Sequence, residues 1–367
     1  MTFPSGADGS LPYIVAGFVL AALISLATTP VVRGYVRRRG IVDRPDPRRV
    51  HRRPLPRGGG VAVVVGFVVV GGGLVLVARG APALTSARPP DDLELAGLFV
   101  GGILAAAIGA LDDLFDLRAR WQMLGQIAVA VVAVAFGITV VLIGNPFGSD
   151  NIVFPEPLAI LFTIVWIVGM INSINFIDGL DGLSSGIGLI AAVTLGLLSL
   201  TINVGQPLVA VLCFVLAGAL LGFLRWNFHP AVIFQGTAGV MFLGTTLAVL
   251  AILGTAKVIV ALLVLGVPII DTFWVIVRRL SRGRSPFSPD LGHIHHRLLD
   301  LGLSQRSTVL VIYAICALLG VVSLIASAEA VAYTFLAAGV GFGLVLFLIA
   351  REPKEALESA SYDDRDE

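Results

Sequence analysis

Long apolar segments separated by short polar loops follow one another along almost the whole chain. They lie at residues 11–30, 58–79, 93–111, 122–143, 157–174, 184–203, 207–224, 238–255, 257–276, 308–327 and 330–350. Each has about the 20 residues that an α-helix needs to cross the hydrocarbon core of a bilayer. The segments are continuous rather than alternating, which excludes a membrane β-barrel. The pattern predicts an all-α integral membrane protein with about 11 transmembrane helices.

Composition supports this prediction. Hydrophobic residues make up 57% of the 367 residues and charged residues only 13%, so the apolar surface exceeds what one globular core could hide from water. We expect one polytopic domain over residues 1–350 and a short polar cytoplasmic tail over 351–367. Gly236 and Pro268 are candidates for breaks within helices. Cys213 and Cys316 lie inside apolar runs, and we interpret both as small core residues.

The distribution of Lys and Arg predicts the orientation, because basic loops remain in the cytoplasm. If the arginine-rich loop at 31–57 is inside, alternation of the segments places 22 of the 25 basic residues on that side. Only Arg79, Arg88 and Lys257 then fall outside. We therefore expect the N-terminus outside and the C-terminus inside. The lipid bilayer is the implied partner, and nothing in the sequence suggests a nucleic acid.

The unusual polar residues gather at the predicted cytoplasmic face. They form three clusters, which are Asp112, Asp113 and Asp116 in ALDDLFD, Asn172, Asn175, Asp178 and Asp181 in NSINFIDGLDG, and His293, His295 and His296 in HIHHR. Taken singly, Asp116 or Asp290 could equally be an ordinary solvated helix end. Because acidic side chains at helix ends in lipid are costly, three clusters on one side indicate a functional site.

The adjacent carboxylates of Asp112 and Asp113 repel one another unless a cation or a proton lies between them. Mg²⁺ is the obvious cation, because it prefers oxygen ligands and is usually shared between carboxylates and substrate phosphates. Spacings of three would place Asn172, Asn175, Asp178 and Asp181 along one helical face. Gly179 and Gly182 would end that helix. The histidines beside Arg297 have the wrong spacing for a zinc protease site and suit a diphosphate, unless they are simply surface residues of an amphipathic loop helix.

These motifs resemble those of the polyprenyl-phosphate N-acetylhexosamine-1-phosphate transferases. The likeness runs from about Thr29 to Tyr313 and covers VDRPDPRRVHRRPLPRGGG, ALDDLFDL, NSINFIDGLDGLSSG, RWNFHPAVIFQGTAGVMFLG and the segment ending HIHHRLLDLG. The opening and ending motifs are similar to the branch that transfers GlcNAc 1-phosphate, rather than to the phospho-MurNAc-pentapeptide branch. The resemblance implies transfer of a sugar 1-phosphate from a UDP-sugar to undecaprenyl or decaprenyl phosphate, with release of UMP. This transfer would be the first membrane step in the assembly of a cell-wall or surface polysaccharide, at a bacterial plasma membrane.

The resemblance also implies roles for individual residues. Asp112 would deprotonate or orient the lipid phosphate, with Asp113 supporting it, and Asp178 and Asp181 would lie against the metal and the uridine. Mg²⁺, with Mn²⁺ as an alternative, would be held by Asn175 and by position 237. The donor would be bound by Asp181, by Phe234 stacked on uracil, and by His293, His295, His296 and Arg297 on the diphosphate or sugar. A homodimer is compatible with the sequence.

One position departs from the family pattern. Where the family usually reads FMGDAGS, this chain reads FQGTAGV, so the acidic metal ligand is replaced by Thr237 and the serine by Val240. A threonine hydroxyl can contact a metal but brings no charge, which should weaken Mg²⁺ binding. This departure leaves open a catalytically impaired relative that binds nucleotide or lipid phosphate. Two other functions also stay open, namely transfer of phospho-MurNAc-pentapeptide and, from a different class, an ion-coupled transporter with carboxylates along an ion path.

Overall fold

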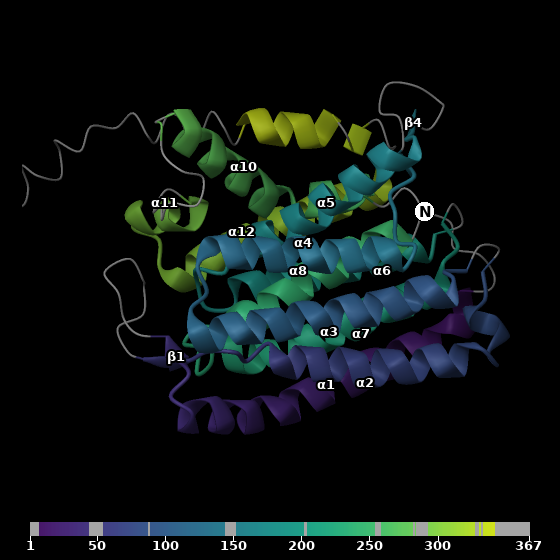
Figure 1. Ribbon diagram of the computed structural model, residues 1–367, viewed down its shortest axis with the longest axis horizontal. Coiled ribbons are helices and arrows are strands. Elements are labelled where there is room, and N and C mark those ends of the chain that lie inside the picture. The colour runs from purple at the N-terminus through teal and green to yellow at the C-terminus, as the bar shows by residue number, and fades with distance from the viewer. Residues whose placement is uncertain are drawn as a thin grey trace, which may run out of the picture.

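The computed structural model describes residues 7–43, 54–86, 89–143, 152–201, 204–253, 258–281, 283, 293–326, 330–331 and 333–341. Its helices are α1 (Ala7–Arg38), α2 (Val61–Ala78), α3 (Asp92–Phe115), α4 (Ala119–Ala135), α5 (Glu156–Ile177), α6 (Leu183–Ser199), α7 (Pro207–Asn227), α8 (Gly236–Leu253), α9 (Val258–Val264), α10 (Gly266–Ser281), α11 (Ile294–Asp300) and α12 (Gln305–Ile325), with a 3₁₀ turn η1 (Pro82–Leu84). Most long helices lie side by side along the longest dimension of the molecule (Figure 1).

Two small antiparallel hairpins connect the helices. Strand β1 (Val42–Asp43) pairs with β2 (Leu55–Pro56), with Val42 opposite Pro56. Strand β3 (Leu142–Ile143) pairs with β4 (Ile152–Val153), with Leu142 opposite Val153. The β1–β2 hairpin lies at the same end of the molecule as α11, and β4 lies at the opposite end (Figure 1).

The predicted helical membrane protein is confirmed at this level. Within the described residues, seven helices are long and apolar enough to cross a membrane, namely α1, α2, α3, α5, α7, α8 and α12. Helices α4 and α6 are also apolar but have 17 residues each. The predicted core placement of both cysteines is confirmed, since Cys213 and Cys316 are buried and neither forms a disulfide within the described residues.

Some predicted boundaries are wrong. The segment expected at 122–143 ends as a helix at Ala135, and its last residues form β3 instead. The segment expected at 257–276 is divided at Leu265 into α9 and α10, close to the interruption expected at Pro268. Gly236 does not break a helix but begins α8, with a φ of 74° that favours glycine. The last predicted span continues past the described residues, and the predicted tail lies outside them.

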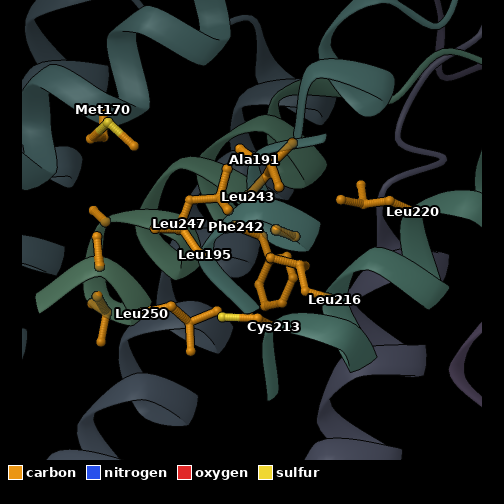
Figure 2. Close-up of a cluster of buried hydrophobic side chains, with 14 of the residues drawn as sticks. Met170, Ala191, Leu195, Cys213, Leu216, Leu220, Phe242, Leu243, Leu247 and Leu250 are labelled. Atoms are coloured by element: carbon orange, nitrogen blue, oxygen red, sulfur yellow. The ribbon is translucent and has the colours of Figure 1, made fainter. Parts of the chain in front are cut away.

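Helix α8 forms the centre of the bundle. Seventeen of its 18 residues are buried, and its largest contacts are with α3 and α5. Figure 2 shows Phe242, Leu243, Leu247 and Leu250 of α8 within a cluster to which α5, α6 and α7 contribute. The Trp166 indole of α5 donates to the Ala248 carbonyl at 3.1 Å, and the Phe242 ring lies 5.6 Å from that of Phe67. The core therefore fixes α8 from several sides and holds its N-terminus in one place.

Helices α1 and α7 make the most extensive contact in the bundle. Gly218 and Gly222 on α7 allow it, because a Cβ at either position would lie 2.1 Å from a backbone oxygen of α1, on Phe18 or Ala22. Small residues spaced by four let helix backbones approach closely in a membrane, where apolar burial alone drives little association. This pair of glycines anchors α1 to the bundle.

Replacing Gly222 by alanine should therefore destabilise the protein by about 1–3 kcal/mol, the usual cost of overpacking, because the backbone of α1 cannot move aside locally. Thermal unfolding of the purified protein in detergent measures the effect. Gly73→Ala on α2 is the control, since nothing lies within 4 Å of a Cβ there. Equal melting temperatures for Gly222→Ala and the wild type would contradict this packing.

Candidate active site

The acidic pair closes α3 at one end of the bundle. Asp112 is buried, and its Oδ1 accepts hydrogen bonds from the Leu117 backbone N–H at 3.0 Å and from the Gln122 amide at 2.8 Å. These bonds shape the turn from α3 into α4. Asp116 caps α3 in the left-handed conformation, with φ 47°, and its side chain is exposed. The carboxyl group of Asp112 is thus fixed in orientation, while that of Asp116 is in solvent.

Asp113 joins α3 to α8. Its Oδ1 accepts from the Thr237 N–H at 2.8 Å, and its Oδ2 accepts from the Ala238 N–H at 3.0 Å. These are unpaired N–H groups of the first turn of α8, where the helix dipole also favours a negative charge. Gly109 permits the close approach, since a Cβ there would lie 2.4 Å from the Thr237 carbonyl oxygen.

Arg57 lies at the centre of the acidic group. Its Nε contacts Asp113 Oδ1 at 2.7 Å, its Nη1 contacts Asp116 Oδ1 at 3.2 Å, and its Nη2 faces Asp112 Oδ2 at 3.5 Å. Nη2 also donates to Thr237 Oγ1 at 2.8 Å. The Arg57 guanidinium thus contacts both aspartates between which the sequence predicted a cation, and Mg²⁺ at this position stays a prediction.

The three glycines after Arg57 explain its position. The Gly59 and Gly60 N–H groups donate to the Phe234 and Gln235 carbonyls, both at 2.8 Å. A Cβ on Gly60 would lie 2.2 Å from the Gly239 Cα. The chain before α2 can therefore lie directly against the start of α8, which places Arg57 beside Asp113.

The second cluster meets the first through Asp178. The Ser184 hydroxyl contacts the Asp178 carboxylate and lies 2.8 Å from Gln235 Oε1. Burial, helped by the nearby charges of Asp113 and Asp181, raises the pKa of Asp178 to about 7, although Ser184 and Arg57 oppose the shift. A carboxyl group with this pKa can take up and release a proton near neutral pH.

Asp181 lies in the turn between α5 and α6. Its Oδ2 lies 2.7 Å from His229 Nδ1 and accepts from the Ala231 N–H at 3.1 Å. The Tyr313 hydroxyl of α12 donates to the Gly182 carbonyl at 2.5 Å. As predicted, the glycines accompany the end of α5, and Gly182 has a φ of 79°. The DGLDG turn is therefore held by α12 and by the segment before α8.

The histidine motif packs against this turn. A Cβ on Gly179 would lie 2.3 Å from His295 Nε2. The His295 ring stacks on that of His293 at 5.6 Å and contacts that of His296 at 4.4 Å. Burial, followed by the charges of His296 and His293, lowers the pKa of His295 well below its ordinary value. This shift favours the neutral form of His295, so its ring offers a nitrogen atom rather than a positive charge to a diphosphate.

The remaining residues that the sequence predicted for the site do not share one location. Asn172 is directed away from the acidic group, because its amide donates to Gln126 of α4 at 2.6 Å. The prediction of one helical face is wrong, since Asp178 caps α5 and Asp181 lies beyond it. Asn175 is half-buried, and its amide has no hydrogen-bond partner among the described residues. Phe234 is half-buried between the β1–β2 hairpin and α8, and Asp290 lies outside the described residues.

The donor chemistry fits a hard divalent cation, because carboxylate, amide and hydroxyl oxygens converge at this end. The arrangement of the side chains, however, does not by itself form a metal site among the described residues. Within the described part of the chain, no three His, Cys, Asp or Glu side chains come close enough together to hold a metal ion. Arg57 instead contacts the oxygens of Asp112, Asp113 and Thr237.

Sequence reasoning missed several residues of the site. Asp271 of α10 accepts from His293 Nδ1 at 2.7 Å and from the Ile294 N–H at 2.9 Å, so it fixes the start of α11. An aspartate inside an apolar run was the available signal, because such a residue needs a partner. Arg57 was counted only as one of many loop arginines, and its distance of 180 residues from Thr237 left no local pattern.

Comparison with known proteins gives consistent matches. The model of glycosyl transferase family 4 matches residues 95–255. The chain is 34% identical to a probable undecaprenyl-phosphate N-acetylglucosaminyl 1-phosphate transferase of Bacillus subtilis, over 84% of this chain and 83% of that protein. It is 37% identical to decaprenyl-phosphate N-acetylglucosaminephosphotransferase of Mycobacterium tuberculosis H37Rv, over 80% and 77%. It is 30% identical to undecaprenyl-phosphate alpha-N-acetylglucosaminyl 1-phosphate transferase of Escherichia coli K12, over 78% and 77%.

Asp271→Ala should loosen α11, because it leaves the buried Ile294 N–H unpaired, at a cost of about 1–3 kcal/mol, and a helix of seven residues is marginal alone. We expect amide hydrogen exchange in 294–300 to become at least about fivefold faster, with the core of α8 unchanged. Asp300→Ala, at an exposed position of the same helix, is the control. Unchanged exchange in Asp271→Ala would show that this carboxylate does not hold α11.

Proposed function

Since this chain belongs to glycosyl transferase family 4, we propose that it transfers N-acetylglucosamine 1-phosphate from UDP-N-acetylglucosamine to undecaprenyl or decaprenyl phosphate. The products are the polyprenyl-diphospho-sugar and UMP. The observation that carries the proposal is the convergence of the DD, DGLDG and HIHHR motifs at one end of a membrane bundle, in a chain similar to transferases of this name. An ion-coupled transporter is less well supported, because these charges gather at an end rather than along a path.

The reaction brings anions together. An oxygen of the lipid phosphate attacks the β-phosphorus of the donor, a new P–O bond forms, and the bond from the β-phosphorus to the bridging oxygen breaks. UMP leaves with the α-phosphate. Because every reacting group is negatively charged, catalysis depends on alignment and charge neutralisation. This requirement suits a site that combines fixed carboxylates, a guanidinium and a histidine cluster.

Each carboxylate has a role that follows from its contacts. Asp113 fixes the start of α8, since both its oxygens accept from N–H groups there, and the remaining lone pairs of these oxygens are available to a cation. Asp178 would receive the proton of the lipid phosphate, because its pKa of about 7 is near the pH of the working solution. Asp112 would orient the same phosphate indirectly, through the Arg57 guanidinium that its Oδ2 faces.

The remaining polar side chains of the site would bind the donor and the cation. Asp181, Phe234, His293, His296 and Arg297 would bind the nucleotide, diphosphate or sugar. His295 would add a neutral ring nitrogen. Asn175 and the oxygens of Asp112 and Asp113 would hold Mg²⁺ or Mn²⁺. When bound, the ion supplies neutralisation of the diphosphate charge.

Release of UMP tests the function directly. Purified protein is incubated with polyprenyl phosphate, Mg²⁺ and, in turn, UDP-N-acetylglucosamine, UDP-MurNAc-pentapeptide and other UDP-sugars. We expect UMP with UDP-N-acetylglucosamine and only when the lipid is present. Release with UDP-MurNAc-pentapeptide alone would assign the other branch. Binding of UDP-N-acetylglucosamine without UMP would identify a non-catalytic relative.

Asp112→Asn and Asp178→Asn should each lower the rate of UMP release at least about a hundredfold, the range for loss of a positioned acid–base or charge-stabilising group. Asp92→Asn, an exposed acid at the opposite end of α3, is the matched control and should keep the wild-type rate. Near-normal rates in both site variants, with folding confirmed, would reduce these carboxylates to solvated helix ends.

The site should face the cytoplasm, on the side predicted for 22 of the 25 basic residues. A cysteine placed at exposed Asp300 should be protected from impermeant thiol reagents in intact cells, and one placed at exposed Pro89 should react. Cys213 and Cys316 give no background because both are buried. Labelling at 300 from outside would reverse the orientation.

A further inference from the structure

The side chain of Arg57 is almost fully committed to the acidic group. All three of its guanidinium nitrogens contact acceptors on Asp112, Asp113, Asp116 or Thr237, and only 22% of the side chain is exposed. Guanidinium stays charged at any relevant pH and has N–H donors in a fixed planar arrangement. Arg57 is therefore a permanent cation seated among three carboxylates.

The same oxygens suit a divalent ion. Mg²⁺ and Mn²⁺ bind carboxylate oxygens, and the oxygens of Asp112 and Asp113 that face Arg57 belong to the pair that would hold the ion. Two cations on the same oxygens would repel one another strongly, since a divalent charge and a unit charge lie within a few ångströms. Occupation by the guanidinium and by a metal ion is thus mutually exclusive.

Thr237 is part of the same arrangement. Its hydroxyl oxygen accepts from Arg57 Nη2 at 2.8 Å, and its backbone N–H donates to Asp113. An uncharged acceptor at this position fixes the guanidinium and adds no negative charge for a metal. The hydroxyl therefore acts on Arg57 in this structure, and the resemblance alone had suggested that it acts on the metal.

We propose that Arg57 is a built-in counter-cation that competes with the divalent ion for the oxygens of Asp112 and Asp113, with the Thr237 hydroxyl as its anchor. This inference rests on the proposed function for the use of a divalent ion. Metal binding displaces the guanidinium, which is then free to bind the phosphate oxygens of a substrate. Metal and substrate consequently bind together better than either binds alone.

Binding of Mn²⁺ to the purified full-length protein, measured by electron paramagnetic resonance without substrate, tests the competition. Removing the competing charge in Arg57→Gln should tighten Mn²⁺ binding at least about tenfold. Arg57→Lys keeps a cation and should bind Mn²⁺ within about threefold of the wild type. Arg79→Gln, which removes an exposed arginine paired with Asp92 elsewhere, is the control and should change nothing.

Thr237→Val is a second variant, and it tests the proposed role of Arg57 even if Arg57→Gln does not fold. Valine keeps the shape of threonine but cannot accept from the guanidinium, so Mn²⁺ should bind a few-fold more tightly. Weaker Mn²⁺ binding in Thr237→Val would make Thr237 a metal ligand and overturn the anchor. Unchanged binding would overturn it as well.

The two arms separate this inference from the reaction. A wild type that releases UMP, together with unchanged or weaker Mn²⁺ binding in Arg57→Gln, would overturn the competition and leave the transferase in place. Tighter Mn²⁺ binding in Arg57→Gln without UMP release from the wild type would overturn the reaction and support the competition. Absence of Mn²⁺ binding to every variant at millimolar concentration would also overturn the competition.

Discussion

The site depends on the hydrogen bonds and the ion pair of the Asp113 carboxylate. This carboxylate accepts two backbone N–H groups from the first turn of α8 and contacts Arg57, so one side chain joins the end of α3, the start of α8 and the loop before α2. The buried position of α8 among α3 and α5 makes that junction rigid. Asp112 and Asp116 are placed relative to it, because Arg57 in turn contacts both.

Much of the architecture could be predicted from the sequence, and the limits have physical causes. Apolar runs long enough to cross a bilayer found the spanning helices, because backbone groups in lipid must be satisfied within each helix. The end of α4 at Ala135 was missed, since residues of the following hairpin are as apolar as those of a span. Local motifs located the aspartates and histidines. The contacts of Arg57 with Thr237 and of Asp271 with His293 join distant segments, and only the fold reveals them.

The departure at position 237 acquires a meaning from this geometry. Where the family pattern has an aspartate, this chain has Thr237, which lowers the negative charge of the acidic group. The Arg57 guanidinium contacts the Thr237 hydroxyl and Asp113 Oδ1. The raised pKa of Asp178 has a different cause, which is chiefly the burial of its carboxyl group, with the charges of Asp113 and Asp181 adding to it. Both features lower the net negative charge of the site before any substrate is bound.

The central claim is that sugar and β-phosphate move to the lipid as one unit. Donor UDP-N-acetylglucosamine labelled with ³²P at the β-phosphate distinguishes this transfer from that of the sugar alone. With purified protein, polyprenyl phosphate and Mg²⁺, the account predicts that the label enters the lipid fraction in step with release of unlabelled UMP. Label that remains in UDP while sugar enters the lipid, or label that stays in the intact donor, would contradict it.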